Sequence, residues 1–212
     1  SFEEYPRRHP ELFASTDDGA IHCLAPRALA GAPLVIKPAA VSTKTPASLE
    51  ASVKAVLDMA KINRGWCLVA GARDGSVAEY LAEHTALNIV VVEHDAKRLQ
   101  TIRARLMKAG LFGSRVIVLG GEYSELPDYF ANLIVSERAM FGEEVNLPVD
   151  ELARVLRPSG GQLVLGSIKE WPQTSVNKIV NGLKANAHAE TKMRFTSNLL
   201  HFTRGKLKGA GS

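Results

Sequence analysis

Short apolar runs alternate with amphipathic segments along most of the chain. Residues 67–70 and 89–92 are uninterrupted apolar runs, which is typical of strands buried on both faces of a parallel sheet. Between these runs, apolar positions at spacings of three and four predict a helix: Val77, Ala78, Leu81 and Ala82. Residues 66–95 therefore predict a strand, a tight glycine loop, a helix and a second strand.

The same alternation continues toward the C-terminus. Because right-handed crossovers return the chain in the same direction, strands that alternate with helices predict a mostly parallel sheet. Residues 191–195 and 199–203 predict a terminal hairpin, which adds antiparallel strands. The pattern as a whole predicts an α/β fold on a seven-stranded sheet. The remaining elements are expected as helices at 45–60, with Thr45 as N-cap, after Asp95 to about Gly110, at 150–156 and at 172–187, and as strands at 115–119, 132–135 and 162–165.

The first 44 residues follow a different pattern. Two short apolar segments flank Asp18-Gly19, and Asp-Gly between alternating segments is a strong signal for a β-hairpin. Residues 31–45 contain many Ala, Pro and Ser residues, which is typical of a linker. We therefore divide the chain into an N-terminal hairpin with its linker, residues 1–44, and a main domain, residues 45–212.

Composition limits what can be built on these elements. The 212 residues are 46% hydrophobic, enough for one sizeable core, and no apolar run approaches the roughly 18 residues that span a bilayer. Cys23 and Cys67 lie far apart, so we expect reduced thiols and no disulfide. The histidines show no metal-ligand spacing, and no metal site is expected. The net charge of +4 permits a nucleic-acid partner, but the Lys and Arg residues are scattered and do not indicate one.

The glycine loop after the first strand indicates a nucleoside site. Glycines let a ligand approach the backbone, the following helix offers free N–H groups, and Glu93 ends the second strand about 20 residues on, where a carboxylate can bind ribose hydroxyls. The NAD fingerprint needs glycines at loop positions one, three and six. These positions hold Gly71, Arg73 and Ser76, so the NAD pattern fails.

Four motifs resemble another family. The loop Val69-Ala-Gly-Ala-Arg-Asp-Gly75 resembles the acid-x-Gly-x-Gly-x-Gly motif of class I S-adenosylmethionine-dependent methyltransferases. Glu93 stands at the family's ribose-acid position, residues 121–127 resemble its Gly-Asp-x-x-x-Leu-Pro adenine segment, and residues 152–161 resemble the turn before its fifth strand. The resemblance covers residues 45–204. It implies a Rossmann-like class I methyltransferase fold with S-adenosyl-L-methionine as cofactor and S-adenosyl-L-homocysteine as product.

The resemblance also implies how the glycine loop acts. The loop would lie against the methionine part of the cofactor through Gly71, Ala72, Arg73, Asp74 and Gly75. Val69 stands where the family usually has an acid, and Arg73 replaces its middle glycine. An arginine could pair with the methionine carboxylate, or its bulk could fill the space that the cofactor needs. The sequence leaves both alternatives open.

Five further residues would hold the cofactor according to the resemblance. Glu93 would bond the ribose hydroxyls, with His94 beside it. Glu122 would accept a hydrogen bond from the adenine amino group, and the Tyr123 backbone would lie by the ring. These roles suit carboxylates, which only accept hydrogen bonds. Ser136, at the end of the fourth strand, would face the transferred methyl group.

No fixed catalytic residue is expected, because the sulfonium is already activated and the protein mainly holds donor and acceptor in line. Glu137 and Arg138 follow the fourth strand. The resemblance implies that they face the transferred methyl group together with Ser136, but we favour an exposed ion pair between them over a catalytic role.

The sequence therefore supports methyl transfer to an unidentified acceptor. The alternative is a catalytically degenerate cofactor-binding or interaction module of a larger protein, because residues 13–24 resemble one hairpin of a quinoprotein-type (PQQ-like) β-propeller blade. An ordinary hairpin packed on the main domain fits the same residues. An RNA methyltransferase is a third option, which predicts salt-dependent RNA retention. A cytoplasmic location is expected, because this cofactor is made in the cytosol.

Overall fold

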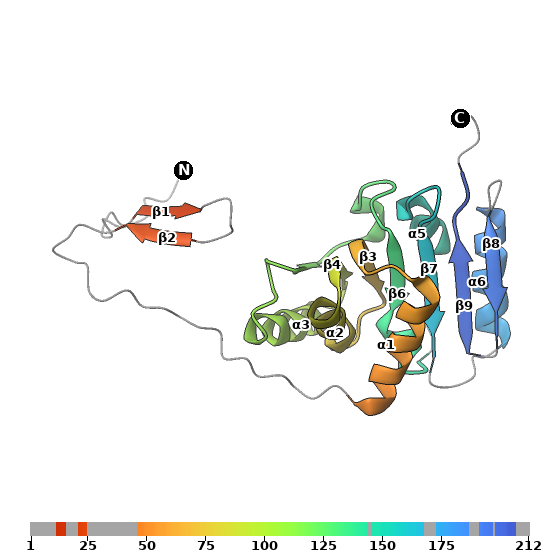
Figure 1. The fold of residues 1–212 in the computed structure, drawn as a ribbon, viewed down its shortest axis with the longest axis horizontal. Helices are drawn as coiled ribbons and strands as arrows, with labels where there is room; N and C mark the ends of the chain where they lie inside the picture. The colour runs from red at the N-terminus through yellow and green to blue at the C-terminus, as the bar shows by residue number, and fades with distance from the viewer. Residues whose placement is uncertain are drawn as a thin grey trace. The chain divides into compact units, whose positions relative to one another are not determined.

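The computed structural model describes residues 12–15, 21–24, 46–143, 146–167, 173–186, 191–196 and 198–206. The chain divides into two compact units, residues 1–38 and 39–212. In the first unit, β1 (Leu12–Ser15) pairs antiparallel with β2 (Ile21–Leu24), as the sequence predicts for a hairpin (Figure 1). The predicted Asp-Gly turn lies outside the described residues.

The second unit is built on a seven-stranded sheet with the order β5-β4-β3-β6-β7-β9-β8 (Figure 1). The first five of these strands run parallel to one another, whereas β9 runs antiparallel to both β7 and β8. The predicted mostly parallel sheet with a C-terminal antiparallel hairpin is confirmed. The strands are β3 (Arg64–Ala70), β4 (Ala86–Val92), β5 (Val116–Leu119), β6 (Leu133–Ser136), β7 (Gln162–Gly166), β8 (Lys192–Phe195) and β9 (Leu199–Thr203).

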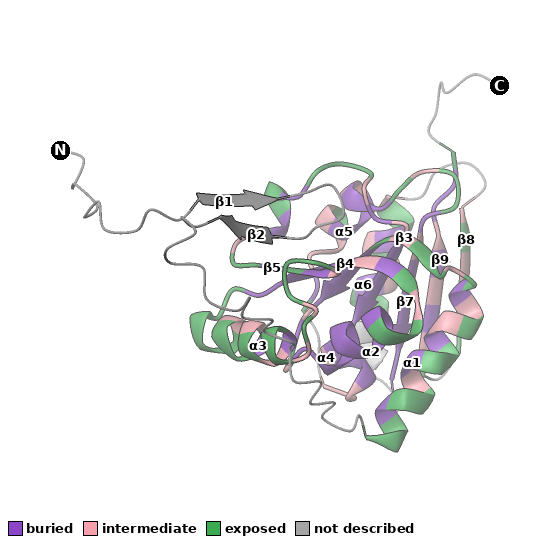
Figure 2. Ribbon diagram, turned by 60° about the vertical axis from the view of Figure 1, so that its left-hand side comes forward, coloured by how far each residue is buried: buried purple, intermediate pink, exposed green. Residues whose placement is uncertain are grey.

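Helices cover both faces of this sheet, and two apolar cores result (Figure 2). Successive side chains of a strand point to opposite faces, so Val91 of β4 packs with α1, α2 and α3, whereas Val92 belongs to the core with α5 and α6. No described helix is long and apolar enough to cross a membrane. The helices are α1 (Ala47–Ala60), α2 (Ser76–His84), α3 (Ala96–Lys108), α4 (Glu137–Met140), α5 (Val149–Val155) and α6 (Gln173–Ala185), with a 3-10 turn η1 (Tyr123–Glu125).

Two predicted helix starts have different outcomes. Asp95 is the N-cap of α3, and its side chain accepts the Arg98 N–H at 2.8 Å, as predicted. Thr45 is not the N-cap of α1. The Pro46 carbonyl accepts the N–H groups of Leu49 and Glu50, so Pro46 holds the cap position and Ala47 is the first helical residue.

The parallel strands bring the predicted site together. β3, β4 and β6 are neighbours that end at one edge of the sheet. Gly71 follows β3, Glu93 follows β4, and Ser136 is the last residue of β6. In open α/β sheets, ligands bind at this carboxyl edge.

Candidate functional site

A hollow in two parts lies at this carboxyl edge. The inner cavity, beside the glycine loop, has a volume of about 130 Å³, and the outer pocket has about 520 Å³. The two share His94, Tyr123, Asn146 and Leu147. Ligand pockets usually exceed roughly 300 Å³, so the inner cavity alone is small and a ligand of nucleoside size needs both parts. The inner cavity is also lined by Gly71, Ala72, Val92, Glu93, Arg98 and Arg138.

Glu93 is buried in the wall of the inner cavity, with only 5% of its side chain exposed. It is the first polar residue after the apolar run of β4. Its Oε1 accepts the Asp95 N–H at 2.8 Å and Arg98 Nη2 at 3.0 Å. Its Oε2 accepts no hydrogen bond from the described residues. One carboxylate oxygen is thus held in place, and the other is available to a ligand.

A second carboxylate, Glu137, holds the glycine loop. Its Oε2 accepts the N–H groups of Arg73 at 2.7 Å and Gly75 at 3.1 Å. Its Oε1 accepts the Val77 N–H and the Ser76 hydroxyl, each at 3.0 Å. Burial raises the pKa of the Glu137 carboxyl above its ordinary value, although the loop N–H groups oppose this shift. The two oxygens of an ionised carboxylate can accept all four of these hydrogen bonds.

The predicted ion pair between Glu137 and Arg138 is wrong. Glu137 is fully buried, and Arg138 pairs instead with Glu143 at 3.0 Å. β6 lies beside β3, so a side chain that follows β6 reaches the loop after β3 and the start of α2. The first N–H groups of a helix lack intrahelical partners and attract an anion. The sequence contains one indirect indication that a distant side chain caps α2: the helix begins after Gly75, which has no side chain of its own to do so.

Arg73 lies on the outside of the glycine loop. Its Nε is 2.9 Å from Glu143 Oε1, its Nη1 is 3.3 Å from Asp74 Oδ2, and its guanidinium stacks over the Phe141 ring at 4.0 Å. It is not among the residues that line the inner cavity. In this structure the side chain therefore does not fill the space beside Gly71.

Asp74 faces the start of α2 rather than the cavity. Its Oδ1 accepts the Ser76 N–H at 3.0 Å and lies 3.7 Å from Arg105 Nη1. Burial acts to raise the pKa of Asp74, but the hydrogen bonds from Ser76 and the charge of Arg105 outweigh it, and the pKa is lowered. Asp74 is thus ionised, and its carboxylate bonds to the start of α2 rather than facing a ligand.

Tyr123 joins the strand end of β5 to the glycine loop. Its side chain is buried, and its hydroxyl accepts the Gly71 N–H at 3.0 Å. Burial raises the pKa of Tyr123, so the phenol stays neutral. The sequence prediction concerned only the backbone of this residue. Its side chain lines both parts of the hollow.

The remaining predicted residues differ in exposure. Glu122 is 71% exposed, and its Oε1 lies 3.4 Å from His94 Nδ1. The His94 ring meets the Tyr123 ring edge-on at 5.5 Å. Ser136 is buried, and its Oγ accepts the Ala139 N–H as N-cap of α4. Sequence reasoning did not assign Arg98, Asn146 and Leu147 to the site, although they line the inner cavity.

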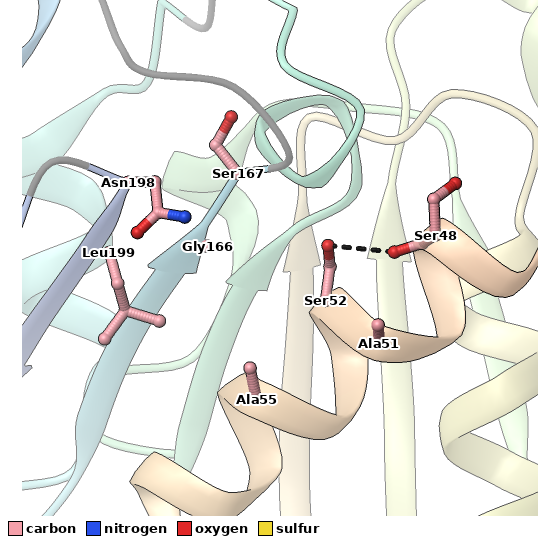
Figure 3. Close-up of a pocket in the computed structure, with 8 residues that line it drawn as sticks. All are labelled: Ser48, Ala51, Ser52, Ala55, Gly166, Ser167, Asn198 and Leu199. Carbon is pink, nitrogen blue, oxygen red and sulfur yellow. Dashed lines mark hydrogen bonds between the residues drawn. The ribbon is translucent and has the colours of Figure 1, made fainter.

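A separate pocket of about 420 Å³ lies between α1 and the carboxyl end of β7 (Figure 3). Small side chains leave this space open, and no charged side chain of the described residues lines it. The Ser52 hydroxyl bonds back to the Ser48 carbonyl at 3.1 Å. The lining residues are Ser48, Ala51, Ser52, Ala55, Gly166, Ser167, Asn198 and Leu199.

Solved structures share this fold. A Methanococcus maripaludis protein proposed to be an S-adenosyl-L-methionine-dependent methyltransferase has 18% identity and a TM-score of 0.60, over 76% of this chain and 85% of that chain. An S-adenosylmethionine-dependent O-methyltransferase from Thermotoga maritima has 12% identity and a TM-score of 0.59, over 94% of this chain and 79% of that chain. An S-adenosylmethionine-dependent methyltransferase from Aquifex aeolicus has 18% identity and a TM-score of 0.56, over 75% of this chain and 92% of that chain.

At these identities the likeness shows the fold, which is the Rossmann-like fold of S-adenosylmethionine-dependent methyltransferases. No protein-family model matches the chain, and no curated protein matches it by sequence. A fold hosts several functions, so the function rests on the site itself.

Proposed function

We propose that this protein binds S-adenosyl-L-methionine at the two-part hollow and transfers its methyl group to an acceptor. The observation that carries the proposal is Glu93. Its buried carboxylate lies beside the glycine loop, held by Arg98 through Oε1, with Oε2 left for a ligand. A carboxylate at the end of the second strand suits the two hydroxyls of a ribose.

The other cofactor contacts follow from this placement. Gly71 and Ala72, the two residues of the glycine loop that line the inner cavity, would lie against the methionine part, and Ser136 would lie near the methyl group. Glu122 and the Tyr123 backbone would meet the adenine in the outer pocket, with His94 at the boundary. The cofactor, when bound, supplies a methyl group on an activated sulfonium. The chain's own task is to hold it in line with the acceptor.

The acceptor would approach from the side of β6 and β7. The uncharged pocket between α1 and β7 is at the same sheet edge as the glycine loop. β7 is two strands from β3, or roughly 10 Å at ordinary strand spacing. The serine hydroxyls and the Asn198 amide that line this pocket favour an acceptor with a neutral polar group over one with a charged group.

Isothermal titration calorimetry with S-adenosyl-L-methionine and S-adenosyl-L-homocysteine tests the cofactor assignment. Glu93→Gln should weaken binding about 10- to 100-fold, because a hydrogen bond to a charged group contributes about 1.5–3 kcal/mol. Glu83→Gln, on the exposed end of α2, is the matched control and should bind as the wild type does. The absence of heat with wild-type protein at millimolar ligand would exclude the proposed function.

A cofactor-binding or interaction module without turnover is the second candidate. Two observations favour an interaction module: the inner cavity is small, and the Tyr123 hydroxyl already accepts the Gly71 N–H, which a ligand would otherwise bind. Binding without methylation of any cell extract would support this module. The propeller resemblance of residues 13–24 stays a prediction, because the side chains of β1 and β2 lie outside the described residues.

A further inference from the structure

A basic hollow lies at the opposite edge of the sheet from the cofactor site. It has a volume of about 500 Å³ and is lined by two turns, 61–64 and 157–161, and by Asn132 at the start of β6. Lys61, Arg64 and Arg157 line it, and no carboxylate of the described residues does. Three positive charges from distant parts of the sequence therefore meet in one concavity, which focuses their field on a bound anion.

The two arginines of this hollow differ from most of the other described arginines. Within the described ranges, Lys61, Arg64 and Arg157 make no ion pair and no side-chain hydrogen bond, and all three are exposed. Most arginines elsewhere already bind acceptors: Arg73, Arg98, Arg105, Arg138 and Arg154 pair with carboxylates, and Arg103, Arg115 and Arg204 bond to carbonyls. The hollow thus holds guanidinium groups whose donors are left for an external acceptor.

The backbone that carries the cations is fixed. The Lys61 N–H donates to the Leu57 carbonyl at 2.8 Å and ends α1. The second turn is anchored to the end of β9, because Ser159 and Gly160 donate to the Gly205 and Arg204 carbonyls at 3.1 and 3.0 Å. The cations therefore project from preorganised turns, which lowers the cost of binding a ligand between them.

Asn132 adds a neutral donor to the floor of the hollow. Its Oδ1 accepts the Trp66 N–H at 3.0 Å, and its amide packs so closely on Gly65 that a Cβ added there would clash with Oδ1. These contacts fix the amide plane. Its Nδ2 donates to none of the described residues, so it supplements the cations as a donor for an oxyanion.

We propose that this hollow is a binding site for a phosphate group. Arginine presents a planar fork that matches phosphate oxygens, and lysine contributes a point charge. Arg64 is the first of the seven residues of β3, and the glycine loop follows the last, which places the two roughly 20 Å apart at about 3.3 Å per residue. The site is therefore independent of the proposed cofactor. The phosphate comes either from a small phosphorylated molecule or from a nucleic-acid backbone.

Amide NMR titrations of the full chain with sodium pyrophosphate, at constant ionic strength, test the site. Resonances of residues 61–65 and 157–161 should shift, while those of residues 71–75 should not. The double variant Arg64→Gln/Arg157→Gln should bind pyrophosphate at least tenfold more weakly than the wild type. The control Lys54→Gln/Lys108→Gln removes the same charge from exposed helix positions and should bind as the wild type does.

Fluorescence anisotropy with a labelled single-stranded RNA distinguishes the two sources. If the phosphate belongs to a nucleic acid, the salt dependence of RNA binding should fall by about 1.4 in log–log slope in the double variant, at about 0.7 per lost contact. A slope that stays unchanged while pyrophosphate binding weakens assigns the site to a small phosphorylated molecule. Equal pyrophosphate and RNA binding by the double variant and the control variant would overturn the proposal.

Discussion

The ends of β6 and β4 each carry a buried glutamate, and the two are used differently. Glu137, after β6, accepts four hydrogen bonds from the glycine loop and the start of α2. Glu93, after β4, accepts two, both on Oε1. A carboxylate whose oxygens are all occupied by its own chain holds structure in place. One with an unoccupied oxygen beside a cavity is available to a ligand.

Removing Glu137 should have the largest effect on stability. Glu137→Ala leaves the N–H groups of Arg73, Gly75 and Val77 without their acceptor, in a fully buried site. Each unsatisfied buried group costs about 1–3 kcal/mol. We expect the free energy of unfolding to fall by about 3 kcal/mol, as measured by urea denaturation.

Glu143 provides the control for this substitution. It accepts from two arginines near the same loop, but a third of its side chain is exposed. Exposed ion pairs contribute little, so Glu143→Gln should lower the free energy of unfolding by less than about 1 kcal/mol. Equal losses for the Glu137 and Glu143 variants would show that the loop does not depend on Glu137.

A variant of Arg98 tests whether cofactor binding depends on the hydrogen bond that holds Oε1 of Glu93 in place. Arg98→Met removes the 3.0 Å hydrogen bond and lets the carboxylate turn. We expect calorimetry to show S-adenosyl-L-methionine affinity about threefold weaker, in the range of one net hydrogen bond and less than for Glu93→Gln. Lys97→Met removes the same charge one residue away, without touching Glu93. If both variants lose affinity equally, Arg98 acts only through its charge.

The Tyr123 hydroxyl is a neutral anchor of the glycine loop, so its removal should affect the fold less than the removal of Glu137 does. Tyr123→Phe removes the acceptor of the Gly71 N–H. We expect a loss of about 1 kcal/mol in unfolding free energy and faster hydrogen exchange at the Gly71 amide. Tyr80→Phe, a buried tyrosine stacked on His84, should leave that exchange rate unchanged. An unchanged rate in the Tyr123 variant would contradict the anchor.

Local signals found most of the fold but misread two positions. The cap at Asp95 was predictable, because the side chain bonds a backbone group three residues on. The cap at Thr45 was wrong by one residue: local preference places Thr at the cap and Pro at the first helical position, but the helix begins at Ala47 and Pro46 holds the cap position without a side-chain hydrogen bond. The pairing of Glu137 with Arg138 was wrong because sequence neighbours were taken as partners. Glu137 bonds residues 60 to 64 positions away.

The sequence by itself determined the order of strands and helices, because apolar periodicity depends on neighbours a few residues apart. It also identified the glycine loop and Glu93 as a candidate nucleoside site, because the distance between them along the chain is typical of such sites. Only the tertiary structure decided which groups those residues bind. It brought Tyr123 to Gly71, turned Arg73 away from the cavity, and gathered Lys61, Arg64 and Arg157 into one hollow. Such contacts join strand ends and turns that are far apart in the sequence. The order of strands in the sheet decides which strand ends and turns lie together, and no local pattern encodes that order.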